Sequence, residues 1–324
     1  MTKQALPSWA EEMRRIFRSG SVGQFLIHGA IFDLVPFHPK NGETQFLGLK
    51  KFLEEVMLQP FDVVVRYDRG TGIRATKGLK QLMSFLKSYD EWNGTSYARS
   101  PASIPRAPAT ALGVLDRLVD WCTQHTAIEN GKLVRRPIRI AIIVDYVQFI
   151  APSGGSLQTT AHADSVIRLL EWASDPALVE SSALTILLTE TLADVHGSVT
   201  GSPYSAKLQI QLPDAQELVD FMGDLIARDA GLKDCLELEP DVVAQRLVGL
   251  SRVNLRNAVQ YASRNKLMIG PDYLAKKRRE LIEKECQGLL DFIESDNTLD
   301  DVAGHTEAVA WLRQDVELLK EGNI

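Results

Sequence analysis

The most constraining stretch of this sequence is a short apolar run at residues 141–144, which leads directly into Asp145. Apolar runs without polar alternation are typical of strands that are buried on both faces, as in parallel sheets covered by helices. Ligands of such sheets bind at the carboxyl ends of the strands, where Asp145 would stand. In phosphate-binding folds an acid at this place holds Mg²⁺. The alternative is that Asp145 merely ends the strand, as Asp often does.

The rest of the chain supplies strands and helices in alternation. Strand-like segments occur at residues 24–28, 61–65, 183–189 and 207–212, and helical spacing is seen at residues 7–18, 46–58, 77–89, 112–125 and 163–173. Residues 30–44 and 93–108 are expected to be loops. After residue 214 the pattern becomes helical only, at residues 216–228, 240–248, 253–264 and 274–294. We therefore predict an α/β fold with a five-stranded parallel sheet, followed by a helical lid.

Composition narrows the class of protein. The chain of 324 residues is 45% apolar and carries a net charge of −6, which gives no global case for nucleic-acid binding. No apolar run has the length of a membrane span. Three widely spaced cysteines favour the reducing cytoplasm. One local group of basic residues is interpreted as a solvated surface, and the alternative is nucleic-acid binding. The group consists of Arg66, Arg69, Arg74, Lys77, Lys80 and Lys87.

The strand ends resemble those of the AAA+ ATPases, which belong to the P-loop NTPases. Asp145 matches the Walker B acid, but Tyr146 stands where the family usually has the Glu that polarises the attacking water. The triplet Thr189, Glu190 and Thr191 ends the fourth strand, where the family keeps a polar sensor-1 residue. We expect Asp145 to be structural, accepting hydrogen bonds from nearby hydroxyl or backbone groups such as those of Thr189 or Thr191.

The resemblance extends into the predicted lid and covers about residues 20–270. The Leu-Pro-Asp sequence at 212–214 matches the turn before the family's first lid-proximal helix, and residues 250–258 resemble the helix that carries the sensor-2 arginine. Arg256 is the better match for that arginine and Arg252 the second. The alternative for Arg256 is an exposed helical arginine. Residues 144–150 also resemble a strand of hexameric replicative helicases, but those proteins lack a helical lid.

The phosphate-binding loop departs from the family's pattern. The first strand should lead into Gly-x-x-x-x-Gly-Lys-Ser/Thr, whose backbone N–H groups and lysine hold the phosphates. Here Gly29 survives, the lysine is absent, and Asp33 would repel a triphosphate. The other glycine-rich stretch, residues 69–74, is interpreted as a turn, and no arginine finger is evident at residues 197–206. The resemblance implies ATP and Mg²⁺ for the family, yet we expect this chain to bind neither and not to hydrolyse ATP.

The last part of the chain resembles the segment that opens a further AAA+ module. Residues 297–304 contain an Asp-Val-x-Gly sequence ending in Gly304, which in the family lies against the adenine, and a helix is expected at 305–320. The alternative is an ordinary helix capped by Asp301 or Thr298. The expected organisation is an N-terminal helix (1–19), a core with a degenerate P-loop (20–213), a lid (214–270), and a linker helix with the start of a following module (271–324).

Three functions remain open at this stage. The first is a degenerate AAA+ module that regulates or assembles an active AAA+ ATPase domain, which makes that adjoining domain or a homo-oligomer its partner. The second is an ATPase that binds nucleotide and remodels a protein substrate. The third is a helicase-like nucleic-acid-binding module, which the negative charge disfavours. We expect no membrane partner and a cytoplasmic location.

Overall fold

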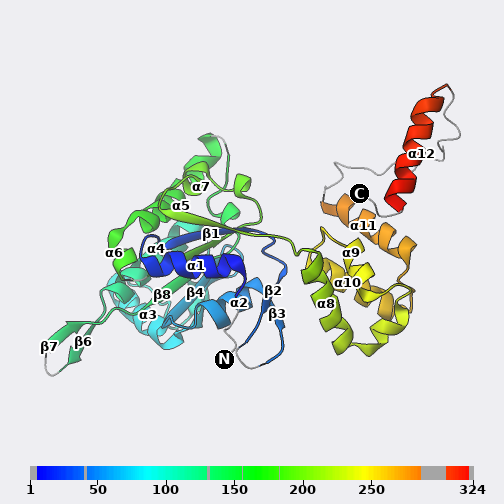
Figure 1. Ribbon diagram of the computed structural model, residues 1–324. Helices are drawn as coiled ribbons and strands as arrows, with labels where there is room; N and C mark the ends of the chain where they lie inside the picture. Colours follow the sequence, from blue (N-terminus) through cyan, green and yellow to red (C-terminus); the bar gives the residue numbers. More distant parts are fainter. Residues whose placement is uncertain are drawn as a thin grey trace.

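A six-stranded sheet forms the centre of the computed structural model, which describes residues 6–39, 42–129, 132–154, 156–181, 183–285 and 304–320 (Figure 1). Five strands run parallel, and the sixth, β5, pairs antiparallel with β4 at one edge. The strand order is β10 (Ser205–Ile210), β1 (Gln24–Gly29), β9 (Leu184–Leu188), β8 (Ile140–Val144), β4 (Val63–Asp68) and β5 (Gly72–Lys77). The prediction of a parallel α/β core is confirmed, and every residue of β8 is buried.

Helices cover both faces of this sheet because successive strand residues point to opposite sides. Ile142 and Val144 of β8 pack in one cluster of buried residues, while Ala141 and Ile143 pack in the other. The first cluster is covered by α3 (Leu79–Asn93), α4 (Pro108–Thr123) and α5 (Ser156–Ser174), and the second by α1 (Ser8–Ser19) and α2 (Leu49–Phe52). A π-helical turn, η1 (Leu53–Met57), continues α2 directly. Short elements follow elsewhere: η2 (Pro101–Ser103), η3 (Val147–Phe149), α6 (Pro176–Glu180), η4 (Leu192–Asp194) and α7 (Gly197–Thr200).

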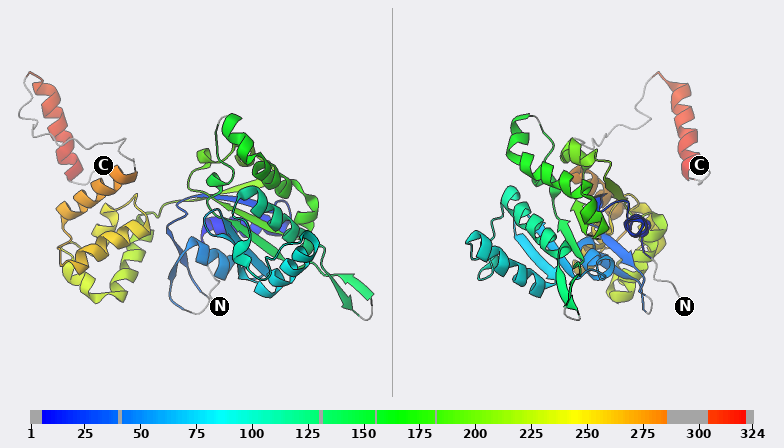
Figure 2. Two further views of the ribbon diagram at one scale, coloured as in Figure 1. Left: turned by 180° about the vertical axis from the view of Figure 1, so that it is seen from behind. Right: turned by 90° about the vertical axis from the view of Figure 1, so that its left-hand side faces the viewer.

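The chain also forms two hairpins and an extra edge strand that the sequence pattern did not predict. The expected loop 30–44 contains β2 (Leu34–Phe37), which pairs with β3 (Gln45–Gly48). The helix expected from residue 46 therefore begins only at Leu49. The second hairpin, β6 (Thr126–Glu129) with β7 (Lys132–Arg135), projects away from the core in Figures 1 and 2. β5 was missed because its last four residues are polar or only partly buried, so that no apolar run marks it.

A helical domain lies beside the core (Figure 2). It consists of α8 (Ala215–Arg228), η5 (Ala230–Cys235), α9 (Pro240–Arg246), α10 (Arg252–Arg264) and α11 (Pro271–Glu285), which enclose a hydrophobic cluster of their own. Asp214 begins α8 with a capping box, because its side chain accepts from the backbone N–H of Glu217 while the Glu217 carboxylate accepts from the backbone N–H of Asp214. A last helix, α12 (Thr306–Lys320), lies beyond this lid in both figures. No helix among the described residues is long and apolar enough to cross a membrane.

Candidate functional site

The candidate site lies at the carboxyl ends of the parallel strands β1, β8 and β9. Gly29 ends β1, Asp145 follows β8, and Thr189 follows β9. These three strands are neighbours in the sheet, because β9 pairs with both β1 and β8. The sequence thus brings the predicted P-loop position, Walker B acid and sensor-1 residues to a single edge, where open parallel sheets bind their ligands.

Asp145 is held by two cations. Its carboxylate is 1% exposed, and Oδ2 accepts from Nη2 of Arg66 at 2.6 Å and from Nε of Arg66 at 3.2 Å. Nζ of Lys50, in the first turn of α2, lies 3.1 Å from the same oxygen. The other oxygen, Oδ1, is buried and has no hydrogen-bond partner among the described residues. One half of this carboxylate is therefore fully engaged while the other half is left without a donor.

The sheet geometry explains why Arg66 reaches Asp145. Val64 and Ile143 both pack in the cluster under α1 and α2. Arg66 and Asp145 each follow two residues later on the neighbouring parallel strands β4 and β8, so both side chains point to that same face. Glu54 completes the group from η1, with Oε1 3.2 Å from Nη1 of Arg66. Four charged side chains, two of each sign, consequently form one compact network.

The network also fixes the protonation state of its arginine. Burial alone would lower the pKa of Arg66, but the hydrogen bonds and charge of Asp145, followed by those of Glu54, outweigh burial and raise it. The guanidinium is therefore a permanent positive charge beside Asp145.

Tyr146 covers the network from outside. Its backbone adopts the left-handed conformation, with φ of 55°, which is uncommon for a bulky residue. Nζ of Lys50 lies 4.8 Å from the centre of the Tyr146 ring, a cation–π distance. The ring centre of Phe32 is 5.9 Å from that of Tyr146, and Phe32 itself is half-exposed. An aromatic pair therefore stands where the sequence comparison would place a catalytic glutamate.

Four backbone donors at the end of β1 and in the loop after it are engaged within the protein. The N–H of Gly29 donates to the carbonyl of Glu190 at 3.0 Å, and the N–H of Ala30 donates to that of Ile210 at 2.9 Å. The next donors turn inward too, from Ile31 to the Gly29 carbonyl and from Asp33 to the Ala30 carbonyl. Gly29 itself is required by its φ of 94° and by the carbonyl oxygen of Ile210, with which a β-carbon would collide. This loop is a closed turn against β9 and β10.

The sensor-1-like residues contact this loop and not Asp145. Thr189 is fully buried, and its hydroxyl donates to the carbonyl of Thr191 at 3.1 Å. Glu190 is exposed and offers its backbone carbonyl to Gly29. The expectation that Thr189 or Thr191 would donate to Asp145 is wrong, because the Thr189 hydroxyl donates to the carbonyl of Thr191 instead and the cations Lys50 and Arg66 are the partners of Asp145.

The lid contributes a second ion cluster, in which Arg252 and Asp33 are buried and Glu217 is about half exposed. Arg252 at the start of α10 is 4% exposed, with Nη1 3.6 Å from Oδ2 of Asp33 and 3.3 Å from the carbonyl of Leu34. Nη2 of Arg252 lies 3.0 Å from Oε2 of Glu217 on α8. The Oδ1 atom of Asp33 accepts from the N–H of Val253 at 3.0 Å. The P-loop position is thereby bound to the lid by its own aspartate.

Two other sequence candidates lie apart from this cluster. Arg256, one turn further along α10, is half-buried and forms no hydrogen bond or ion pair with any described residue. Gly304 lies two residues before the first residue of α12, and the residues 297–303 that complete its motif lie outside the described ranges. Of the two arginines considered for sensor 2, it is Arg252 that reaches the loop after β1.

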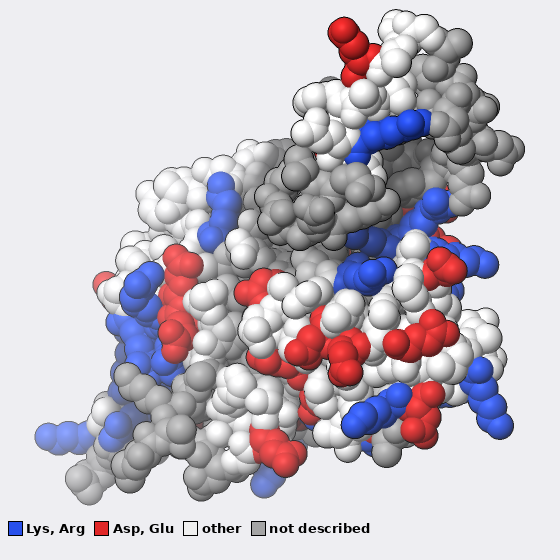
Figure 3. All heavy atoms as spheres, turned by 45° about the vertical axis from the view of Figure 1, so that its right-hand side comes forward, with Lys and Arg blue, Asp and Glu red and all other residues white. Residues whose placement is uncertain are grey.

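The remaining groups considered from sequence have local roles. Only the first half of the stretch 69–74 is a turn: residues 69–71 turn the chain, with the Asp68 carboxylate accepting from the N–H groups of Gly70 and Thr71, and residues 72–74 begin β5. Within the described ranges, no three His, Cys, Asp or Glu side chains gather as a metal cluster. Basic and acidic side chains are interspersed over the face shown in Figure 3. Sequence reasoning missed Lys50 and the inward role of Arg66; the signal for Arg66 was a charge that directly follows three valines in a buried strand.

The sheet order, the acid after β8 and the helical lid define the AAA+ class of P-loop NTPase folds. The family model for the AAA+ chaperone N-terminal Rossmann-like domain matches residues 2–211, and that for the AAA+ chaperone second helical domain matches residues 219–287. The chain therefore belongs to the AAA+ chaperones. No curated protein matches it.

Proposed function

We propose that this AAA+ chaperone module has lost nucleotide hydrolysis and serves as a regulatory or assembly domain for an active AAA+ ATPase domain. The observation that carries the proposal is the double engagement of Asp145 by Lys50 and Arg66. In an active site the Walker B acid holds Mg²⁺ through oxygen contacts. Here a protein side chain, the guanidinium of Arg66, supplies beside Asp145 the positive charge that the metal would bring.

The loop after β1 supports the same proposal. A phosphate cradle needs free backbone N–H groups, since these make the contacts to the anion. The N–H groups of Gly29, Ala30, Ile31 and Asp33 already donate to protein carbonyls. A triphosphate would have to break these bonds and would then face the Asp33 carboxylate. Each N–H that turned to a phosphate would take its hydrogen bond away from a protein carbonyl, and a carbonyl left unpaired while buried costs about 1–3 kcal/mol.

The tyrosine at position 146 is a further argument against ATP hydrolysis. The phenol of a tyrosine is protonated at neutral pH, so it is a poor general base. The ring of Tyr146 is also engaged by Lys50 and lies against Phe32. The other carboxylate of the network, Glu54, is already paired with Arg66 at 3.2 Å, so it is not a free base.

The lid contacts indicate what the module does instead. The ring of Phe46 on β3 meets that of Phe221 on α8 at 4.6 Å, and Arg252 links α10 to Asp33. These contacts join lid and core directly. A module fixed in this way is suited to hold a partner domain in position. Its partners, in this proposal, are protein: an active AAA+ domain, further copies in an oligomer, and the chaperone's protein substrate.

One observation favours a second candidate, an ATP-binding remodelling ATPase. Lys50 follows Gly48 at the start of the helix after β1, and its Nζ already lies beside the candidate metal-binding acid. If Arg66 moved entirely to Glu54, Asp145 would be released and its unpartnered Oδ1 could accept a metal or water. In this candidate Lys50 takes the part of the missing P-loop lysine.

A titration separates the two candidates. The full chain is titrated with ATP and Mg²⁺ by calorimetry, and phosphate release is measured in parallel. The proposal expects no binding at millimolar ATP and background phosphate release. Micromolar binding that is lost in Lys50→Ala but kept in Lys51→Ala would establish the second candidate instead. Lys51 is the matched control, since it is an exposed neighbour whose one ion pair with the described residues is with Glu55 at 3.8 Å.

The two free cysteines among the described residues, Cys122 and Cys235, are compatible with the reducing cytoplasm that we propose as the module's location.

A further inference from the structure

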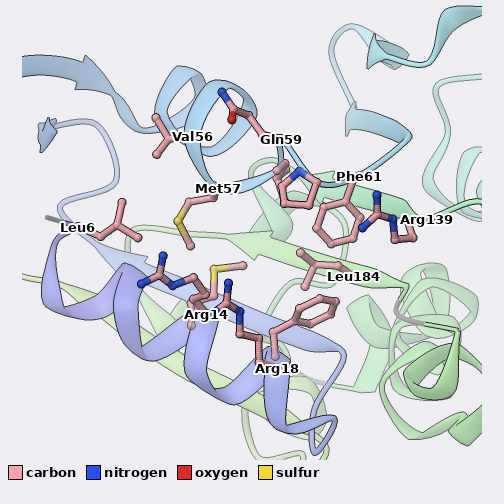
Figure 4. Close-up of a pocket in the computed structure, with 13 residues that line it drawn as sticks. Leu6, Arg14, Arg18, Val56, Met57, Gln59, Phe61, Arg139 and Leu184 are labelled. Atoms are coloured by element: carbon pink, nitrogen blue, oxygen red, sulfur yellow. The ribbon is translucent and has the colours of Figure 1, made fainter. Parts of the chain in front are cut away.

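An apolar pocket of about 410 Å³ opens at the edge of the core opposite the candidate nucleotide site (Figure 4). It lies at the amino ends of β4, β8 and β9, between α1 and the end of η1. Its apolar side chains include Met13, Phe17, Val56, Met57, Phe61 and Leu184. Pockets of about 300–1,000 Å³ with a mainly apolar lining are typical of small-molecule sites.

Three arginines border this pocket. Arg14 and Arg18 are four residues apart on α1 and therefore lie on the same side of that helix, and Arg139 stands across from them in Figure 4. Arg139 is partly compensated, because its Nε lies 3.6 Å from Oδ2 of Asp62. Arg14 and Arg18 are exposed and form no ion pair with any residue that the structure describes. The mouth of the pocket is thus a positive site on a chain whose net charge is −6, and it favours an anion.

The turn after η1, which forms one wall of the pocket, already uses its backbone groups within the protein. The N–H of Leu58 donates to the carbonyl of Leu53, and the carbonyl of Leu58 accepts from the N–H of Phe61. The carbonyl of Gln59 accepts from Nζ of Lys77 at 2.7 Å. A peptide placed here would bury amide groups that need partners, whereas an alkyl chain brings no polar group to its buried part. The wall therefore favours an alkyl chain over a peptide.

Two further features of the walls suit a flexible chain. Met13 of α1 and Met57 of η1 both line the pocket, and unbranched methionine side chains adapt to the shape of what they contact. η1 is a π-helical turn, a geometry that is frequently found at functional sites. The pocket consequently combines an adaptable apolar floor with a cationic mouth.

We propose that this pocket binds the carboxylate of an unbranched fatty acid. The alkyl chain lies on the apolar floor, and the carboxylate pairs with Arg14 and Arg18 at the mouth, since guanidinium and carboxylate form strong charge-assisted hydrogen bonds. The site shares no residue with the carboxyl ends of β1, β8 and β9. The inference is therefore independent of the proposed function and stands or falls separately from it.

Calorimetry on the full chain tests the inference with dodecanoate as the probe, kept below the concentration at which it forms micelles. Dodecanoate should bind at one site per chain with a dissociation constant below about 100 μM. Each methylene removed from the probe should weaken binding about three- to fourfold, because it takes apolar surface out of the pocket. Dodecanol and dodecyltrimethylammonium, which have the same chain without the carboxylate, should bind at least about tenfold more weakly.

Two pairs of matched variants place the ligand in this pocket. Replacing both Arg14→Gln and Arg18→Gln should weaken dodecanoate binding at least about tenfold and remove its preference over dodecanol. Arg15→Gln changes an arginine of α1 outside the pocket and should leave both unchanged. Met57→Trp should block the floor for every probe, whereas Met268→Trp, at a half-exposed methionine of the lid, should not. Melting curves establish that each variant is folded.

The outcomes decide the proposal in either direction. It is overturned if dodecanoate does not bind to the parent chain, or if it binds at many sites without saturation. Equal binding of dodecanol would show that the arginines do not select the ligand. Equal losses in the variants and their controls would show that the ligand binds elsewhere.

Discussion

Asp145→Asn tests the assignment of this buried acid most directly. The substitution keeps the size of the side chain and one carbonyl oxygen but removes the negative charge that Lys50 and Arg66 share. If Asp145 is structural, the substitution will lower the free energy of unfolding, because two cations lose their common counter-ion. If Asp145 is a working Walker B acid, the substitution will lower the rate of ATP hydrolysis.

The structure sets the size of the stability loss. Breaking a buried ion pair by removing one partner costs about 3–5 kcal/mol. The lower end applies here, because Arg66 keeps Glu54 at 3.2 Å, Lys50 is about one-third exposed, and Asn retains an acceptor. We therefore expect a loss of about 3 kcal/mol in the free energy of unfolding. For a domain of this size that corresponds to a fall of roughly 6–12 °C in melting temperature.

Thermal unfolding and phosphate release are measured on the parent and the variant. Glu55→Gln is the control, because it removes a carboxylate whose pairing with Lys51 is exposed on both sides and should change stability by less than about 1 kcal/mol. Asp145→Asn should melt clearly lower than Glu55→Gln, with background phosphate release in all three proteins. A parent that hydrolyses ATP, and a variant that does not while melting as the parent does, would refute the reasoning.

Three further outcomes follow from single contacts. Gly29→Ala should cost at least about 1–3 kcal/mol in urea unfolding, because φ of 94° strains any other residue. Arg252→Ala leaves Asp33 buried without its cation and should cost about 3–5 kcal/mol, seen as protease sensitivity of the lid; adding Asp33→Leu should recover much of it. Burial raises the pKa of Cys122 to about 12, so native protein at pH 8 should be alkylated at Cys235 and not at Cys122. The stability that the protonated Cys122 thiol contributes is complete below pH 9 and is lost as pH rises towards 12, which alkaline melting curves would detect.

The buried strands could be predicted from sequence because their physical requirement is local. A strand covered on both faces needs an apolar residue at every position, and residues 141–144 show this directly. The lid helices were found for a similar reason, since each repeats apolar residues at helical spacing towards a shared cluster. Asp145 could be placed at the sheet's carboxyl edge by the same argument.

The hairpin β2–β3 could not be predicted, because its stability is not local. Residues 45–48 are exposed or only partly buried, and Phe46 continues the apolar spacing of the helix that follows. The contact that holds β3 is the packing of Phe46 on Phe221 of the lid, far along the chain. Packing against the lid therefore makes residues 45–48 a strand, although their apolar spacing matches a helix.

The partners of Asp145 were likewise beyond a local pattern. Arg66 lies 79 residues earlier in the chain, and only the parallel pairing of β4 with β8 brings it alongside. A hydroxyl partner from the neighbouring β9 was a reasonable expectation, but a guanidinium on the other neighbouring strand forms the stronger, charge-assisted bond. Sequence reasoning located the acid correctly and assigned it the wrong partner.

The two ion clusters together bear on whether the lid can move. A ligand shifts a conformational equilibrium only by the difference between its affinities for the two states. In the proposed function no nucleotide binds, so no such difference arises at this site. The angle between lid and core would then depend on Arg252 with Asp33 and on Phe46 with Phe221. These contacts break only at a cost of several kcal/mol, so that under the proposed function we expect the module to act as a fixed support for a partner domain.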